Sequence, residues 1–203
     1  GLAKVNYNCK PSLISLVRQI REQDFKGPLL LRFPHITNKQ ITTLFDTFNN
    51  SIQEYDYKGS FNAVFPLKVN QLPNFIQPLL SSGKKFNYGL EAGSKAELVI
   101  AMTYNNKNAP ITVNGFKDKE MVHLGFIAKS KGHDITLIIE GLNELQTIIA
   151  VAEETNLPCP NIGLRVRLHS GGSGIWAKSG GINSKFGLTS TEILEAYELI
   201  AGK

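Results

Sequence analysis

A regular alternation of short apolar segments with longer segments of helical periodicity runs along the chain and constrains its fold more than any other feature. The apolar segments have the length and β-branched content of buried strands. Strands that alternate with helices across short connections are typical of βα units, because a parallel strand needs a crossover that returns the chain to the same end of the sheet. The sequence therefore predicts an α/β fold with a parallel sheet.

The alternation predicts one lead-in strand, followed by regular βα units. The expected strands are residues 29–33, 61–70, 86–92, 111–114, 135–140 and 162–168, with residues 4–9 as a further candidate. The expected helices are residues 11–22, 73–82, 94–104, 118–130, 142–154 and 189–200, and another that opens near residue 37 and runs toward residue 49. Capping boxes support three helix starts. They are formed by Thr37 with Gln40, Ser94 with Glu97, and Thr189 with Glu192.

The number of strands bounds the architecture. A closed (β/α)8 barrel needs eight strands and typically about 250 residues. This chain has 203 residues, which accommodate the lead-in strand and about five barrel units. We therefore expect an incomplete TIM-type barrel, truncated after residue 203. The alternative is an open doubly wound sheet whose edges are complete within the chain.

The segment at residues 61–71 contains one lysine, Lys68, near the carboxyl end of an expected strand. Barrels and doubly wound sheets place their chemistry at this end. A desolvated lysine there has a lowered pKa and supplies a neutral amine for a Schiff base. The alternative is a lysine that extends from a strand end into solvent. Because Pro66 cannot donate to a ladder, a bulge or an unpaired position is expected beside it.

Two acids follow in the next unit. Glu91 is expected at the carboxyl end of the neighbouring strand, where a carboxylate would steer the protonation of Lys68 or hold a substrate. The alternative for Glu91 is a solvated loop acid. Glu97 is already explained by its capping box. The order Gly93-Ser94-Lys95 does not have the spacing of a phosphate-binding Walker loop, which excludes a P-loop NTPase.

Arg165 and Arg167 alternate with apolar residues in the last expected strand, so they are expected on one face of it. Directed inward, the two cations would meet at the rim and bind an anionic cofactor or its phenolate oxygen. Directed outward, they would pair with helix acids. The inward direction is favoured, because Leu164, Val166 and Leu168, which alternate with the arginines, would otherwise face the smaller lumen of the barrel.

A glycine-rich segment at residues 169–184 is too long for a simple turn, and Trp176 within it is a candidate anchor or ligand contact. The four histidines do not have metal-ligand spacing, and no Gly-x-Ser-x-Gly elbow is present.

The net charge of +5 comes from scattered lysines, which argues against a nucleic-acid partner. We expect no membrane association. Cys9 and Cys159 are distant in sequence, which predicts free buried thiols and a cytoplasmic protein.

Several segments, taken in order, resemble the biosynthetic arginine decarboxylase family, which consists of PLP-dependent lyases with a barrel of the alanine racemase class. The matching segments are residues 31–34, 65–71, 88–98, 114–118, 163–168 and 179–188. The lysine motif alone is shared with ornithine and diaminopimelate decarboxylases, whereas the whole set is more specific. The resemblance extends over nearly the entire chain.

This resemblance implies that Lys68 forms the Schiff base with pyridoxal 5'-phosphate (PLP) and that Arg165 lies near the cofactor's ring oxygen. Glu91 and Glu97 correspond to acids near the lysine. The implied reaction converts L-arginine to agmatine and CO₂ in polyamine biosynthesis. The resemblance also implies magnesium as a second cofactor and a homo-oligomeric enzyme.

The resemblance further implies that residues 1–203 are the N-terminal part of the barrel domain, and that the remaining barrel strands and a C-terminal β-domain are absent. We therefore expect the fragment alone to be inactive. Three alternatives remain: a non-catalytic PLP carrier, a racemase of the same barrel class, and a decarboxylase of a related basic amino acid. Substrate identity rests on the resemblance, because nothing in these residues recognises a guanidinium group.

Overall fold

The structure, a computed structural model, describes residues 12–168 and 186–202. The chain divides into two compact units, Gly1–Phe33 and Pro34–Lys203. Helix α1 of the first unit spans Leu13–Glu22, close to its predicted bounds, and the Ser12 hydroxyl caps it by accepting a hydrogen bond from the Ser15 amide. The candidate strand at residues 4–9 lies outside the described residues.

The predicted lead-in strand at residues 29–33 is wrong, because these residues have no regular secondary structure. The segment has the apolar composition of a strand, and Leu30 is nevertheless 76% exposed. A strand is stable only when a neighbour satisfies its backbone groups. The five-stranded sheet of the described residues does not include this segment.

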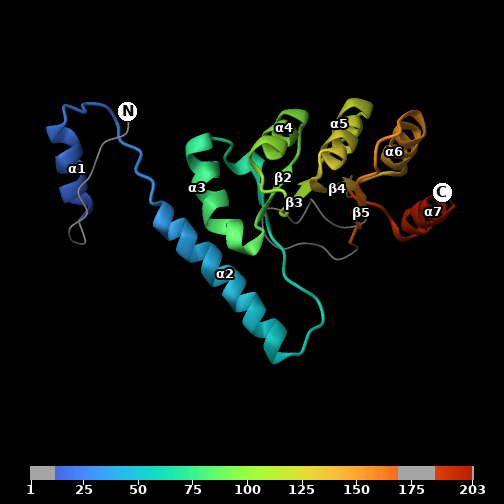
Figure 1. Cartoon of the computed structure of the whole chain (residues 1–203), viewed down its shortest axis with the longest axis horizontal. Coiled ribbons are helices and arrows are strands. Elements are labelled where there is room, and N and C mark those ends of the chain that lie inside the picture. The colour runs from blue at the N-terminus through green and yellow to red at the C-terminus, as the bar shows by residue number, and fades with distance from the viewer. Residues whose placement is uncertain (1–11, 169–185, 203) are drawn as a thin grey trace. The chain divides into compact units, whose positions relative to one another are not determined.

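The second unit is built around a parallel sheet in the order β1-β2-β3-β4-β5. The strands span Val64–Pro66, Gly89–Ala92, Pro110–Val113, Asp134–Ile139 and Asn161–Leu164. The helices are α2 (Pro34–Glu54), α3 (Pro73–Gly83), α4 (Lys95–Tyr104), α5 (Lys119–Ser130), α6 (Leu142–Glu154) and α7 (Ser190–Ala201), with short 3-10 turns η1 (Leu67–Val69) and η2 (Lys84–Phe86). The helices that alternate with the strands lie along one side of the sheet (Figure 1). The predicted βα order and parallel pairing are confirmed.

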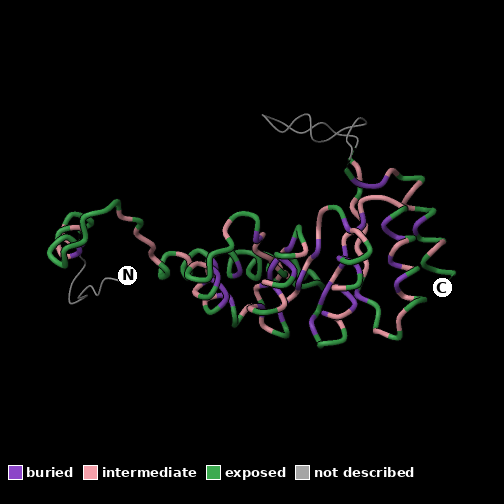
Figure 2. The backbone as a smooth tube through the Cα atoms, turned by 90° about the horizontal axis from the view of Figure 1, so that it is seen from above, coloured by how far each residue is buried: buried purple, intermediate pink, exposed green. Residues whose placement is uncertain are grey.

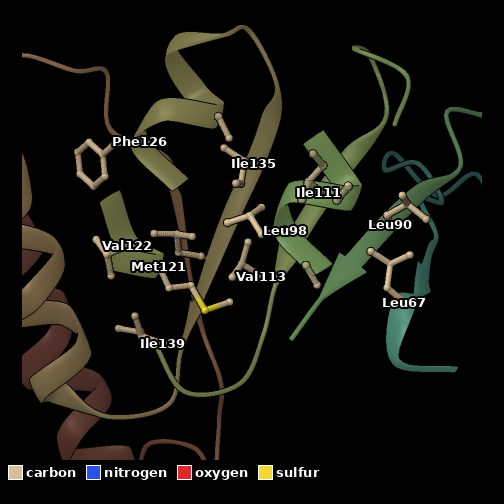
Figure 3. Close-up of a cluster of buried hydrophobic side chains, with 14 of the residues drawn as sticks. Leu67, Leu90, Leu98, Ile111, Val113, Met121, Val122, Phe126, Ile135 and Ile139 are labelled. Atoms are coloured by element: carbon tan, nitrogen blue, oxygen red, sulfur yellow. The ribbon is translucent and has the colours of Figure 1, made fainter. Parts of the chain in front are cut away.

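The hydrophobic core lies between the sheet and these helices. Alternate strand residues such as Val113, Ile135 and Ile139 are fully buried and pack against Leu98 of α4 and Phe126 of α5 (Figure 3). Buried positions therefore recur along the strands and the inner sides of the helices (Figure 2). Residues on the opposite face of the sheet, Glu91 and Thr112 among them, are only partly buried.

The strand expected at residues 61–70 is shorter than predicted. β1 ends at Pro66, and Lys68 lies in the following turn η1. β1 pairs only with β2, so Pro66, which cannot donate to a ladder, occupies the end of a strand at the edge of the described sheet. The irregularity expected beside Pro66 is thus the end of the strand itself.

Helix α2 also begins earlier than predicted. Pro34 is its first residue, so Thr37 lies inside the helix and the Thr37–Gln40 capping box is wrong. Proline at the first helical position loses nothing, because the amide there has no partner within the helix. Phe45 of α2 packs against Phe61, and its ring stacks on Phe86 with a centroid distance of 4.4 Å.

The remaining helices follow their predicted bounds closely. α6 begins and ends at the predicted residues, and α5 is capped by Asp118, whose side chain accepts a hydrogen bond from the Met121 amide. The Thr189–Glu192 capping box of α7 is complete. β5 ends at Leu164, earlier than the predicted strand, and Val166 makes only an isolated bridge with Leu188.

Candidate active-site rim

The candidate residues converge at the carboxyl ends of the parallel strands. Lys68 lies two residues beyond the end of β1, and Glu91 of β2 pairs in register with Pro66, the last residue of β1. Arg165 follows β5, where its amide donates to the Ile139 carbonyl of β4 at 3.0 Å. We call this end of the sheet the rim. The topology thus brings residues from three βα units to one edge, which the sequence predicted for Lys68 and Glu91.

Lys68 is exposed and not desolvated. Its neighbour Leu67 is fully buried in the core and anchors the turn. Within residues 12–168 and 186–202, the Lys68 amine has no hydrogen-bond or ion-pair partner. The structure therefore presents an accessible amine on an anchored turn at the rim.

Glu97 joins the Lys68 turn to helix α4. The Ser94 hydroxyl caps α4 as predicted, by accepting a hydrogen bond from the Glu97 amide. A capping box requires the Glu97 carboxylate to accept a hydrogen bond from the Ser94 amide, and it does not do so here. It accepts from the Gly93 amide at 2.6 Å and from the Gln71 side chain at 2.9 Å. Glu97 is buried, and capping alone does not explain it.

Arg165 and Arg167 have different partners, although the sequence placed them together on one face of a strand. Arg165 Nη1 donates to Glu140 Oε1 at 2.6 Å, and Arg165 Cζ lies 5.0 Å from the centroid of the Phe186 ring. Arg167 Nη2 donates to the Gly187 carbonyl at 3.0 Å. Arg165 is therefore a fixed cation at the rim. Its partner is Glu140, in the turn after β4, and not an acid of a helix.

Two other lysines at the rim are committed to ion pairs. Lys95 lies 2.8 Å from Asp118 and 2.6 Å from Glu120, and these hydrogen bonds raise the pKa of its amine. The reciprocal bond lowers the pKa of the Asp118 carboxyl. Lys117 is fully buried and lies 3.2 Å from Glu144. Of the three lysines, Lys68 is the most exposed.

The sequence reasoning missed Gln71, Lys117, Glu140 and Glu144. Glu144 is the third residue of α6, and a glutamate three residues after a helix N-cap is a capping signal. Gly141 at that N-cap lacks a side chain, so the signal was incomplete. The pairing of Gln71 with Glu97 spans 26 residues and depends on sheet geometry.

Other expected features have mixed outcomes. Cys159 is a free thiol, as predicted, although it is exposed and not buried. Cys9 and the segment at residues 169–184, which includes His169 and Trp176, lie outside the part that the structure describes. In that described part, no cluster of three or more His, Cys, Asp or Glu residues could hold a metal ion. None of its helices is both long and apolar enough to cross a bilayer.

The fold and the rim together define a cofactor-binding barrel domain. Residues 39–203 match the family described as pyridoxal-dependent decarboxylase, pyridoxal binding domain, and the chain belongs to this family. The chain is a homologue of biosynthetic arginine decarboxylases. It is 42% identical to that of Bacteroides thetaiotaomicron over 94% of this chain and 30% of the relative, and 40% identical to that of Tolumonas auensis over 96% of this chain and 31% of the relative.

Solved structures agree with this assignment. The biosynthetic arginine decarboxylase of Campylobacter jejuni has a TM-score of 0.87 and 56% identity, covering 98% of this chain and 31% of that one. A point mutant of the diaminopimelate decarboxylase of Helicobacter pylori, complexed with L-lysine, has a TM-score of 0.64 at 20% identity, covers 92% of this chain and 43% of that one, and shares the fold. The chain thus spans about 30% of the length of the curated relatives it matches.

Proposed function

We propose that this chain supplies the cofactor-binding part of an enzyme that decarboxylates L-arginine to agmatine and CO₂, as a step in polyamine biosynthesis. The observation that carries the proposal is the accessible Lys68 amine on the anchored turn after β1, in a chain of the pyridoxal-binding family. The substrate follows from the names of the similar proteins. The described residues themselves contain no guanidinium-binding site that would identify arginine.

The residues at the rim fit PLP. Lys68 is accessible for covalent attachment, and the Arg165 guanidinium is a cation suited to an anionic ring oxygen. When bound, PLP would supply an electron sink for the electron pair of the bond between the substrate's α-carbon and its carboxylate. Magnesium is not part of the proposal, since the described residues do not suggest a site for it.

Each residue has its own role in this proposal. Lys68 would hold the cofactor through its side-chain amine, which has to lose its proton before it can act as a nucleophile. Glu91 pairs in register with Pro66 at the rim, and its carboxylate is the group that holds this proton near Lys68. Glu97 holds the turn, through Gln71, so that the lysine projects from a fixed backbone.

Reductive trapping tests the covalent attachment. The protein expressed from its complete reading frame is incubated with PLP, reduced with borohydride and mapped by mass spectrometry. We expect a pyridoxyl group on the Lys68 peptide, its loss in Lys68→Arg, and its retention in the control Lys95→Arg. An adduct confined to another lysine, or the absence of any adduct, contradicts the proposal.

Release of CO₂ tests the reaction and the substrate. We expect release from L-arginine and little from L-ornithine, L-lysine or diaminopimelate. If CO₂ is released faster from one of those amino acids than from L-arginine, that amino acid is the substrate and the arginine assignment is wrong. A trapped cofactor without CO₂ release from any of them would indicate the non-catalytic carrier.

A further inference from the structure

A buried ion pair joins the loop after β3 to helix α6. Lys117 Nζ lies 3.2 Å from Glu144 Oε2, and the two side chains are 0% and 4% exposed. The Lys117 amide also donates to Glu144 Oε1 at 2.9 Å. Both oxygens of this carboxylate are therefore occupied, in a place where an unpaired charge would be costly.

The same carboxylate holds the turn that carries Glu140. Glu144 Oε2 accepts a hydrogen bond from the Glu140 amide at 2.8 Å. The N-cap residue of α6, Gly141, has no side chain to cap the helix, and the Glu144 carboxylate accepts from the amide of Glu140, the residue that precedes Gly141. The backbone position of Glu140 consequently depends on Glu144.

Glu140 in turn holds Arg165 at the rim. The Glu140 side chain is 13% exposed, and its Oε1 accepts from Arg165 Nη1 at 2.6 Å. The guanidinium is bounded on another side by the Phe186 ring. A charge-assisted hydrogen bond from a fixed acid restricts a long side chain that otherwise samples many rotamers.

We propose that Lys117 and Glu144 are positioning residues that act through Glu140 to fix the Arg165 guanidinium at the rim. The inference rests on the proposed function, in which Arg165 contacts the cofactor. A buried ion pair is weak support for stability, because the cost of desolvating both charges offsets much of their attraction. Orientation of the Glu140 turn gives this pair a role that an apolar pair could not perform.

Cofactor affinity and absorption test the inference in the protein expressed from its complete reading frame. PLP is titrated into wild type, Glu140→Gln and Glu144→Gln, and the wavelength of the bound cofactor band is followed against pH. The control is Glu154→Gln, which removes the charge of another α6 acid, one that pairs with Lys119 at the surface. We expect about tenfold weaker PLP binding and a displaced pH midpoint of the band in both test variants, and neither change in the control.

A double-mutant cycle shows whether the effect passes through Arg165. In an Arg165→Met background, we expect Glu140→Gln and Glu144→Gln to cause no further loss of PLP affinity. An equal loss in both backgrounds, or unchanged binding in the single variants, would overturn the inference. If Glu144→Gln does not fold, the combined variant Lys117→Met and Glu144→Leu replaces the ion pair with an apolar pair. This variant must show the same loss of PLP affinity. Failure of the proposed function is separate, since wild type would then bind no PLP on Lys68.

Discussion

The Gln71 side chain donates a hydrogen bond to Glu97 at 2.9 Å and thereby ties the turn that carries Lys68 to the start of helix α4. The second Glu97 oxygen accepts a hydrogen bond from the amide of Gly93, the residue that directly follows β2. Glu144 repeats the arrangement in α6, where one oxygen accepts from its own turn and the other from the preceding βα loop. In both helices a glutamate in the first turn joins consecutive βα units at the rim.

Glu97→Ala is expected to destabilise the protein by about 2 kcal/mol, because the Gly93 amide and the Gln71 amide group both lose their acceptor. Gln71→Ala removes only one of these bonds and is expected to cost about 1 kcal/mol. Urea denaturation measures both losses. Equal costs for the two variants would show that the Gly93 bond contributes nothing.

Gly89→Ala is expected to disrupt the packing of β2 against β3. An added Cβ would lie 2.0 Å from the Pro110 carbonyl oxygen, a backbone atom that cannot move aside without shifting β3. We expect a loss of about 3 kcal/mol, measured by thermal or urea denaturation. Gly27→Ala is the matched control, because an added Cβ there meets nothing within 4 Å. A melting temperature unchanged in Gly89→Ala would contradict the close approach.

Stability is expected to fall as the pH drops below about 6.5, because burial and the nearby Lys107 charge lower the pKa of His133 from 6.5. The unfolded chain then binds a proton that the folded chain resists, so the His133 contribution is present above pH 6.5 and is lost as the pH falls toward the folded pKa. Hydrogen exchange of β4 between pH 5 and 7 (about the range in which histidine titrates), corrected for intrinsic rates, measures this loss.

The comparison variant His133→Gln should flatten the pH dependence in that window. Lys107→Met should retain most of it, since burial is the larger cause of the shift. A dependence that persists in His133→Gln would assign it to another group.

Thr189→Ala is expected to weaken helix α7 by about 1 kcal/mol, because the hydroxyl caps the helix by accepting from the Glu192 amide. The hydrogen bond from the Thr189 amide lowers the pKa of the Glu192 carboxyl from 4.5. The carboxylate's contribution is therefore present above pH 4.5 and is lost as the pH falls through its folded pKa. Hydrogen exchange of the Ser190–Ala201 amides measures the cap locally, and unchanged protection in Thr189→Ala at neutral pH would contradict it.

Local patterns in the sequence were sufficient for most of the helices and for the parallel order of the strands. The ends of α6 agree with the prediction, because helical periodicity and capping act within a few residues. The lysine motif and the later segments, taken in order, also indicated the family that residues 39–203 match. The position of Lys68 at the rim followed from strand direction alone.

The tertiary structure decided what depends on partners distant in sequence. Residues 29–33 have the composition of a strand and lack a neighbour to complete it, and β1 ends at Pro66 because a proline cannot extend the ladder. The pairing of Arg165 with Glu140 joins residues 25 positions apart, and that of Gln71 with Glu97 joins residues 26 apart. Such pairs arise only when parallel strands bring their carboxyl ends to one edge, so a pattern read along the chain cannot contain them.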